Sequence, residues 1–430
     1  MFAHLLSRRL AHHGIHYAWV VAAVTFCAMM TTSAALGLPG AMLRPLSAEF
    51  GWNVEQISSV FAVRFALFGL LGPFAASFIL RFGVRAVMVT AAGLIATSMI
   101  LATRVTALWQ LFALWGLMLG CGTGLTALVL GAIVANRWFS ARRGLVLGVL
   151  AASTATGQLL FLPVAAWLIE HHGWRFAVIP VFVACLVVAG LVVLLLRDSP
   201  HELELAAYGD EPASAADTAP ATIALGWRAP FDALAEAARV RSFWILAGTF
   251  FICGLSTNGL VQTHFISLCS DKGLAAVPAA SVLSMMGLFD LVGTTLSGYL
   301  SDRLDNRKLL FWYYGLRGLS LFWLPYSTFT LYGLSLFALF YGLDWIATVP
   351  PTVKLVAQQF GPARAGIVFG WVFAAHQLGA ATAAYGAGLT RTLLLTYDPA
   401  LFAAGAACLM AAFAVLAIAR PAVVAVSATR

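Results

Sequence analysis

Long apolar runs recur along the chain and are separated by short segments rich in arginine, glycine and proline. A helix needs about 20 apolar residues to cross a hydrocarbon core of about 30 Å, and the runs are of this length. They fall at residues 18–40, 56–80, 84–103, 108–135, 144–169, 174–196, 243–268, 278–300, 309–328, 331–353, 366–389 and 399–419. The pattern predicts an all-α integral membrane protein of twelve transmembrane helices.

The twelve runs form two sets of six, because a polar segment separates the sixth from the seventh. Residues 197–241 hold eight of the 17 acidic residues and include an Ala-, Pro- and Asp-rich stretch at 211–220. Such composition is typical of a partly disordered linker. We therefore expect an N-terminal bundle at 1–196, a cytosolic linker at 197–241 and a C-terminal bundle at 242–430.

Composition supports a lipid environment and excludes several classes of site. Hydrophobic residues make up 61% of the chain and charged residues 10%, whereas an ordinary soluble domain has about 25% charged residues. The net charge of +8 comes from residues scattered between the apolar runs, which argues against nucleic-acid binding. The six cysteines show no metal-ligand or paired spacing, so no metal or cofactor is expected.

The basic residues are distributed unevenly between the two sides that twelve spans define. With both termini on one side, that side receives 18 of the 25 lysines and arginines, and the other side receives five. Arg64 and Arg317 fall within spans. The positive-inside rule then places both termini in the cytosol, as in a multi-pass protein of a bacterial inner membrane.

The two halves also align with each other at a single offset of 222 residues. This offset pairs Arg81 with Arg303, Arg85 with Arg307, Arg142 with Arg364, Gly144 with Gly366 and Gly148 with Gly370. Parallel six-helix repeats of this kind place a solute site near the midplane, between the halves, where it opens alternately to either side.

A short loop after the second span of each half resembles the signature of the major facilitator superfamily. In the second half it reads GYLSDRLDNRK from Gly298 to Lys308, and in the first half ASFILRFGVRAV from Ala76. The resemblance implies a major facilitator fold, with gating residues at Arg81, Arg85, Gly298, Asp302, Arg303 and Arg307. In the first half Leu80 stands where the family usually has aspartate. The arginines could alternatively serve only as positive-inside anchors.

Two further segments are similar to the monocarboxylate porter and oxalate–formate antiporter branch of that superfamily. They are RWFSARRGLVLG from Arg137 and HHGWRFA from His171. The branch commonly has aspartate in the eighth helix followed by arginine four residues later, and here Asp290 is followed by Thr294. Some members have lysine after a proline near the end of the first helix, where this chain has Gly40.

Four charged side chains lie inside the spans: Arg64, Asp290, Arg317 and Asp344. A charge at the bilayer centre costs about 2.5–3.5 kcal/mol on insertion scales, so each is a candidate functional residue. Asp290 is the candidate proton site, with a structural ion pair as the alternative. Arg64 could hold a carboxylate through its guanidinium fork or could be paired within the protein. Asp344 is a candidate solute or coupling residue, because the family resemblance places the tenth span along the central cavity. Arg317 is expected to be a packing partner, and Asp344 could pair with it.

Uncharged polar residues add candidates for the solute site. Asn258 and Gln262 are four residues apart in the seventh span and so share a helix face. His376 lies in the middle of the eleventh span, where an imidazole could bond solute, shuttle a proton or make an inter-helix hydrogen bond.

These residues predict a secondary transporter of a small organic anion, most simply a carboxylate, coupled to protons or working by exchange. An exporter of amphiphilic or drug-like compounds is the alternative, and it would be favoured by a large aromatic cavity and a structurally paired Arg64. A non-transporting membrane sensor or scaffold is a further alternative. An enzyme is not expected, because the sequence has no nucleophile–base spacing or phosphate-cradling loop. The expected partners are solute, protons and lipid, and the expected state is a monomer.

Overall fold

The computed structural model describes residues 2–126, 128–210 and 228–419, and this part of the chain is almost entirely helical. The stretch at 211–220 that the sequence marks as disordered lies outside the described residues, as does the tail from 420. The helices of the first half are α1 (Phe2–His12), α2 (Ala18–Phe50), α3 (Val54–Phe82), α4 (Val84–Ala102), α5 (Leu108–Leu111), the π-helical η1 (Phe112–Met118), α6 (Leu119–Leu125), α7 (Leu128–Trp138), α8 (Arg143–His172), α9 (Trp174–Ala177) and α10 (Ile179–Leu195).

The described residues of the connection between the halves include the 3-10 turn η2 (Pro200–Leu203) and the helix α11 (Ala229–Ala237). The second half contains α12 (Arg241–Gly254), the π-helical η4 (Leu255–Gln262), α13 (Thr263–Asp271), α14 (Ala276–Ser301), α15 (Asn306–Trp323), the 3-10 turn η5 (Leu324–Tyr326), α16 (Ser335–Asp344), α17 (Val349–Phe360), α18 (Pro362–Leu394) and α19 (Asp398–Val415).

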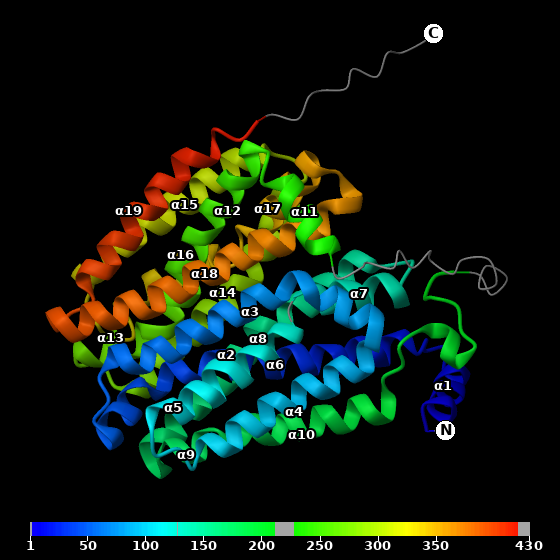
Figure 1. Cartoon of the computed structure of the whole chain (residues 1–430), viewed down its shortest axis with the longest axis horizontal. Coiled ribbons are helices and arrows are strands. Elements are labelled where there is room, and N and C mark those ends of the chain that lie inside the picture. Colours follow the sequence, from blue (N-terminus) through cyan, green and yellow to red (C-terminus); the bar gives the residue numbers. More distant parts are fainter. Residues whose placement is uncertain (1, 127, 211–227, 420–430) are drawn as a thin grey trace, which may run out of the picture.

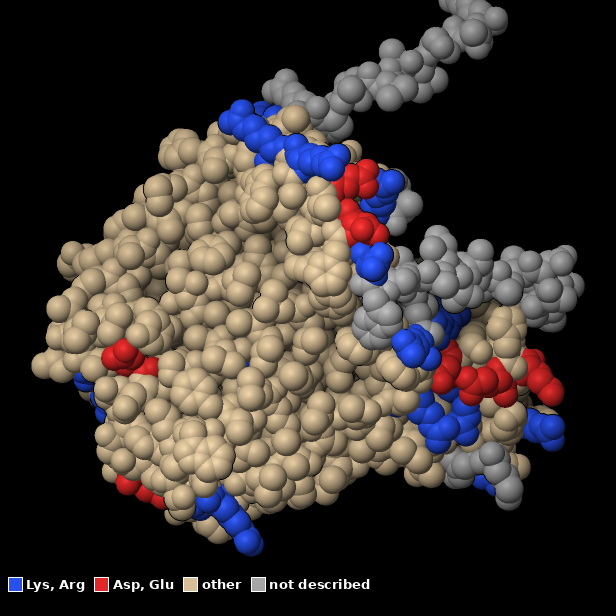
Figure 2. Space-filling view, in the orientation of Figure 1, with Lys and Arg blue, Asp and Glu red and all other residues tan. Residues whose placement is uncertain are grey.

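The helices fall where the apolar runs predict them, and eleven helical stretches of the described chain are long and apolar enough to cross a membrane. The expected ninth span corresponds to α15, which is not among the eleven. It carries Arg307, Lys308 and Arg317 within 18 residues, so its hydropathy is lowered although it lies in the bundle against α19. Figure 2 shows the charged side chains gathered at the ends of the molecule, with a broad uncharged flank between them.

The two ends of the molecule carry different elements. The linker face holds α1, η2 and α11, and the opposite face holds the turns at 51–53, 103–107 and 272–275; in Figure 1 the linker face lies to the right and the opposite face to the left. Two seams join the halves, one where α3 packs on α18 and one where α8 packs on α14.

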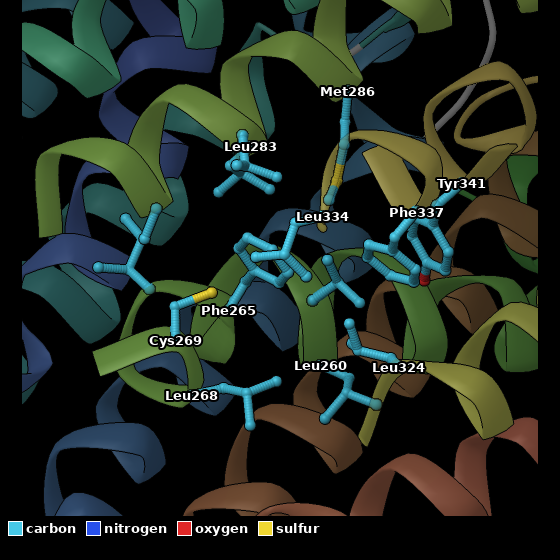
Figure 3. Close-up of a cluster of buried hydrophobic side chains, with 14 of the residues drawn as sticks. Leu260, Phe265, Leu268, Cys269, Leu283, Met286, Leu324, Leu334, Phe337 and Tyr341 are labelled. Carbon is cyan, nitrogen blue, oxygen red and sulfur yellow. The ribbon is translucent and has the colours of Figure 1, made fainter. Parts of the chain in front are cut away.

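The buried apolar clusters show that the halves are joined most closely toward the opposite face. One cluster, drawn in Figure 3, combines side chains of α13, α14 and α16 with Ala41, Leu162 and Ala166 of the first half. A second combines α2 and α3 with Ala380 and Ala384 of α18. The two clusters nearer the linker face each contain residues of one half alone. Apolar packing therefore seals the opposite face and leaves the linker face less closed.

The connecting helix α11 lies over one of the seams. Phe231 of α11 packs on Phe74 of α3, with ring centroids 5.2 Å apart, and Trp371 of α18 donates a hydrogen bond from Nε1 to the carbonyl of Pro230 at 2.8 Å. Arg364 forms an ion pair with Glu236. This helix thus contacts both halves at the linker end of the α3–α18 seam.

Candidate functional site: a cavity between the halves

A cavity of about 540 Å³ lies between the two halves. It reaches Gly144 and Gly148 at the start of α8 and Gly298 at the end of α14, so it extends toward the linker face. Its polar lining consists of Thr32, Ser33, Thr126, Thr154, Gln158, Thr257, Asn258, Gln262, Asp290, Thr294, Thr295, His376 and Gln377. Four of the predicted solute or coupling residues are therefore brought together here, namely Asn258, Gln262, Asp290 and His376.

Asp290 is the only charged residue of the described chain that lines this cavity. Its Oδ1 accepts hydrogen bonds from Thr294 Oγ1 and from the backbone N–H of Ile346, both at 2.9 Å. No lysine or arginine in the described residues lies within ion-pair distance of it. Thr294, which stands where the similar branch has arginine, thus supplies a hydrogen bond but no positive charge, and Asp290 is left without a counter-charge.

The partner of Asp290 comes from a break in the tenth span. Residues 345–348 separate α16 from α17, because Pro350 and Pro351 lack the N–H groups that would continue the helix. In lipid, freed backbone groups must be satisfied by protein. Accordingly Ser297 Oγ donates to the carbonyl of Ala347 at 2.5 Å, and the Asp290 carboxylate accepts from Ile346.

Arg317 forms hydrogen bonds with backbone carbonyls at the other side of the same break. Its Nε donates to Asp344 Oδ2 at 2.7 Å, and its Nη2 donates to the carbonyls of Asp344 and Trp345. The side chain of Arg317 is fully buried. The prediction that Arg317 is a packing partner of Asp344 is confirmed. Neither residue lines the cavity, so Asp344 contacts the solute site only through the broken segment 345–348.

Arg64 differs from Arg317 in having no acidic partner. It is 1% exposed, and neither Nε nor Nη1 has a hydrogen-bond partner in the described chain. Its guanidinium carbon lies 4.5 Å from the ring centroid of Phe65. Arg64 does not line the cavity, but it lies one helical turn from Phe68, which does. A buried cation that lies on ring faces and has two unpaired nitrogens is matched to an incoming anion.

The predicted gating residues of the second half form a cluster at the linker face. Asp302 forms an ion pair with Lys354 of α17 at 2.8 Å, and Lys354 also donates to the carbonyl of Ser301. Arg303 lies over the ring of Tyr299, and Arg307 pairs with Asp305 at 2.6 Å. The signature loop therefore ties α14 to α17 within one half, and Gly298 lies at the cavity mouth.

In the first half a residue that the sequence did not mark supplies a carboxylate to the corresponding loop. Asp198, directly after α10, accepts a hydrogen bond from the backbone N–H of Arg85 at 2.8 Å and lies against Gly83. Arg85 Nη2 donates to the carbonyl of Val193, and the guanidinium carbon of Arg81 lies 5.5 Å from the ring of Phe82. Because Asp198 is distant in sequence from the motif, the loop pattern alone could not indicate it.

Polar contacts cross between the halves at the opposite face. Asp271 of α13 binds Arg44 of α2 at 2.5 Å and Arg391 of α18 at 2.6 Å. Glu55 of α3 accepts a hydrogen bond from Tyr385 Oη at 2.8 Å. Arg44 and Arg391 are two of the five basic residues that the sequence places on the side away from the termini. We call Arg44, Asp271 and Arg391 the opposite-face triad, since together they close the end of the molecule away from the cavity mouth.

Two helical bundles with a solute-sized cavity between them, open toward one face and closed at the other, are the arrangement of a membrane transporter built from two repeats. The family model of the Major Facilitator Superfamily matches residues 21–384, and the chain belongs to this family. It is a multi-pass membrane transporter of a small-molecule solute and not an enzyme.

Individual relatives agree with this assignment. The chain is 25% identical over 352 residues to "Uncharacterized MFS-type transporter YcxA" of Bacillus subtilis (strain 168), covering 80% of this chain and 81% of that protein. It is also 25% identical to "Monocarboxylate transporter 13" of Rattus norvegicus, over 91% of this chain and 86% of the relative. The solved structure of a D-xylose-proton symporter superposes with a TM-score of 0.74 at 16% identity, covering 94% of this chain and 98% of that one. The predicted fold class and family are confirmed.

The buried Arg317–Asp344 pair can be tested by charge removal. Arg317→Met or Asp344→Asn alone leaves one buried charge unpaired, so each should lower the free energy of unfolding by roughly 3–5 kcal/mol. The double variant removes both charges and should lose less than the sum. Thermal unfolding of the purified protein in detergent measures this; additive losses would show that the pair does not act as a unit.

The opposite-face triad can be tested by removing its shared carboxylate. Arg44 is half exposed, so Asp271→Asn should weaken closure by only about 0.5–1 kcal/mol, which is a roughly two- to fivefold rise in the population open at that face. Hydrogen–deuterium exchange in α13 would report it. The control is Asp398→Asn, whose partner Lys272 lies in the same half at 3.8 Å. Equal exchange in both variants would contradict a role for the triad in closure.

Proposed function

We propose that the chain is a secondary transporter of a small organic anion, a carboxylate, that works by proton-coupled symport or by exchange. The cavity would accept solute from the linker face in the present conformation and from the opposite face in the alternate one. Asn258, Gln262 and His376 would bond the solute within it.

One observation carries this proposal: two buried ionisable groups of opposite sign, Asp290 and Arg64, form no ion pair in the described chain. Asp290 lines the cavity with only hydrogen-bond donors around it, and Arg64 is buried on rings with unpaired nitrogens. Burial without pairing is costly for a charge, so each group gains from a transported partner. A proton suits Asp290, and a carboxylate suits the guanidinium of Arg64.

The relatives support the same solute class. Several proteins similar to this chain bear the name monocarboxylate transporter, among them the rat protein and "Monocarboxylate transporter 4" of Rattus norvegicus at 24% identity. Their names concern those proteins. For this chain they add weight to a carboxylate, which the charge of Arg64 favours independently.

The topology that goes with the proposal follows from the charge distribution. The excess of arginine and lysine at the linker face favours a cytosolic linker and cytosolic termini, in a bacterial-type inner membrane. The domains would be 1–196 and 242–430, moving about the two seams as a monomer. The Asp302–Lys354 pair and the Asp198 contacts with the Arg85 loop would act as linker-face gates, and Asp344 would act on coupling through the broken segment.

A second function is favoured by one observation. No lysine or arginine lines the cavity in the described chain, and much of its wall is apolar. An exporter of amphiphilic or drug-like compounds would use such a wall without needing Arg64. This alternative predicts flux of neutral or cationic amphiphiles, whereas a non-transporting sensor or scaffold predicts binding with no flux at all.

Variants at the two unpaired charges test the carboxylate proposal in liposomes. Asp290→Asn should abolish solute-dependent proton movement, because the amide cannot carry a proton across. Arg64→Gln should raise the carboxylate concentration needed for half-maximal flux about 10- to 100-fold, as expected for loss of a charge-assisted hydrogen bond. Radiolabelled solute uptake and an internal pH dye provide the two readouts.

Arg104→Gln serves as the matched control, since Arg104 lies in the turn at the opposite face, away from the cavity. It should behave as wild type. If Arg64→Gln also behaves as wild type, Arg64 does not hold the solute; if Asp290→Asn keeps full proton movement, the coupling residue lies elsewhere.

A further inference from the structure

One wall of the cavity is built from aromatic rings contributed by both halves. Phe68 of α3 packs edge-to-face on Phe373 of α18 with centroids 5.5 Å apart. Phe373 stacks on His376 at 5.8 Å, and His376 lies 4.7 Å from Phe250 of α12. All four side chains line the cavity. We call Phe68, Phe250, Phe373 and His376 the ring wall.

The ring wall lies at one seam and the acidic group at the other. Phe68 and Phe373 belong to α3 and α18, which pack on each other, whereas Asp290 belongs to α14, which packs on α8 and α16. The cavity therefore has an aromatic side and an acidic side. A solute with an apolar ring and a negative group is favoured on the aromatic side, because its charge is then held away from the Asp290 carboxylate.

Two buried polar atoms beside the ring wall have no partner in the described chain. They are Nδ1 of His376 and Oε1 of Gln377, and the two residues are 8% and 1% exposed. Both residues line the cavity. An unsatisfied buried polar atom costs about 1–3 kcal/mol, so the site gains free energy from a ligand that presents a polar group at the edge of its ring.

Arg64 lies one helical turn before Phe68 on α3, with its guanidinium over the rings of Phe61 and Phe65 and outside the cavity lining. Arg64 and Phe68 are four residues apart on α3 and share its face, which separates their Cβ atoms by about 5–6 Å. A carboxylate joined to an aromatic ring by a short spacer spans a gap of this size. The guanidinium and the ring wall can therefore engage the two ends of one molecule when Arg64 becomes accessible.

From this arrangement we infer that the preferred solute is an aromatic carboxylic acid, with its ring against the wall formed by Phe68, Phe373 and His376 and its carboxylate on Arg64. This inference rests on the proposed carboxylate transport and narrows its substrate. The cavity of about 540 Å³ is within the range of roughly 300–1,000 Å³ typical of sites for drug-sized ligands. Acids of two or three carbons would leave the ring wall unfilled.

Competition in liposomes tests the inference with the wild-type chain alone. Uptake of radiolabelled butyrate is measured against unlabelled phenylacetate, 4-hydroxyphenylacetate, acetate and butyrate. We expect the two ring-bearing acids to inhibit at concentrations at least tenfold lower than the aliphatic acids, and the hydroxylated one to inhibit best because its hydroxyl can donate to Gln377. Equal potency of aromatic and aliphatic acids, with butyrate uptake intact, would overturn the inference and leave carboxylate transport standing.

A pair of variants tests where the aromatic ring of the solute binds. Phe373→Leu should weaken inhibition by phenylacetate about three- to tenfold more than it weakens inhibition by unlabelled butyrate, the scale of a lost aromatic contact with its buried area. Phe402→Leu, on α19, is the control: its ring packs on Phe322 of α15 and lies outside the cavity lining, so it should leave inhibition unchanged. An equal effect of both variants would overturn the placement of the ring. If neither butyrate nor phenylacetate is transported by wild type, the proposed function fails together with the inference.

Discussion

The absence of water around buried polar groups is the constraint on which this structure depends. In a lipid-bounded bundle, each buried charge and each freed backbone group must find a partner inside the protein. Arg317 meets this requirement by binding both the Asp344 carboxylate and the carbonyls of the broken tenth span, and Asp290 meets part of it by accepting from Ile346. Among the buried polar atoms without a hydrogen-bond partner in the described chain, those of His376 and Gln377 belong to residues that line the cavity, where a transported ligand is the available partner.

The same constraint explains how the bundle can close one face and leave the other less closed. At the opposite face, apolar clusters run across both halves and need no polar partner. The triad around Asp271 lies at the rim, where water screens it. Apolar packing thus supplies most of the closure. The ion pairs add directional contacts that can break and re-form. Toward the linker face the clusters stay within single halves, which leaves the cavity accessible from that side.

The sequence predicted the helices well because the length and spacing of apolar runs are set by the membrane, and it identified the four intramembrane charges because charges are rare in such runs. The sequence separates the roles of Arg64 and Arg317 only in part. Helix position favoured a packing role for Arg317, but whether Arg64 has an acidic partner depends on side chains far apart in sequence. Asp198, the ring wall and the break at 345–348 were missed for related reasons. Asp198 lies outside the motif, Phe68 and Phe373 are ordinary apolar residues until two helices meet, and Pro350 and Pro351 were read within one continuous run.

The central claim is that carboxylate and proton cross the membrane together through the cavity that Asp290 lines. The most direct test is to impose an inward carboxylate gradient on liposomes containing the wild-type protein and to follow internal pH, with protein-free liposomes correcting for passive entry of the neutral acid. Acidification that requires both protein and carboxylate, and that scales with solute uptake, is the result predicted for symport. Uptake of carboxylate that leaves internal pH at the level of protein-free liposomes would contradict coupling to protons.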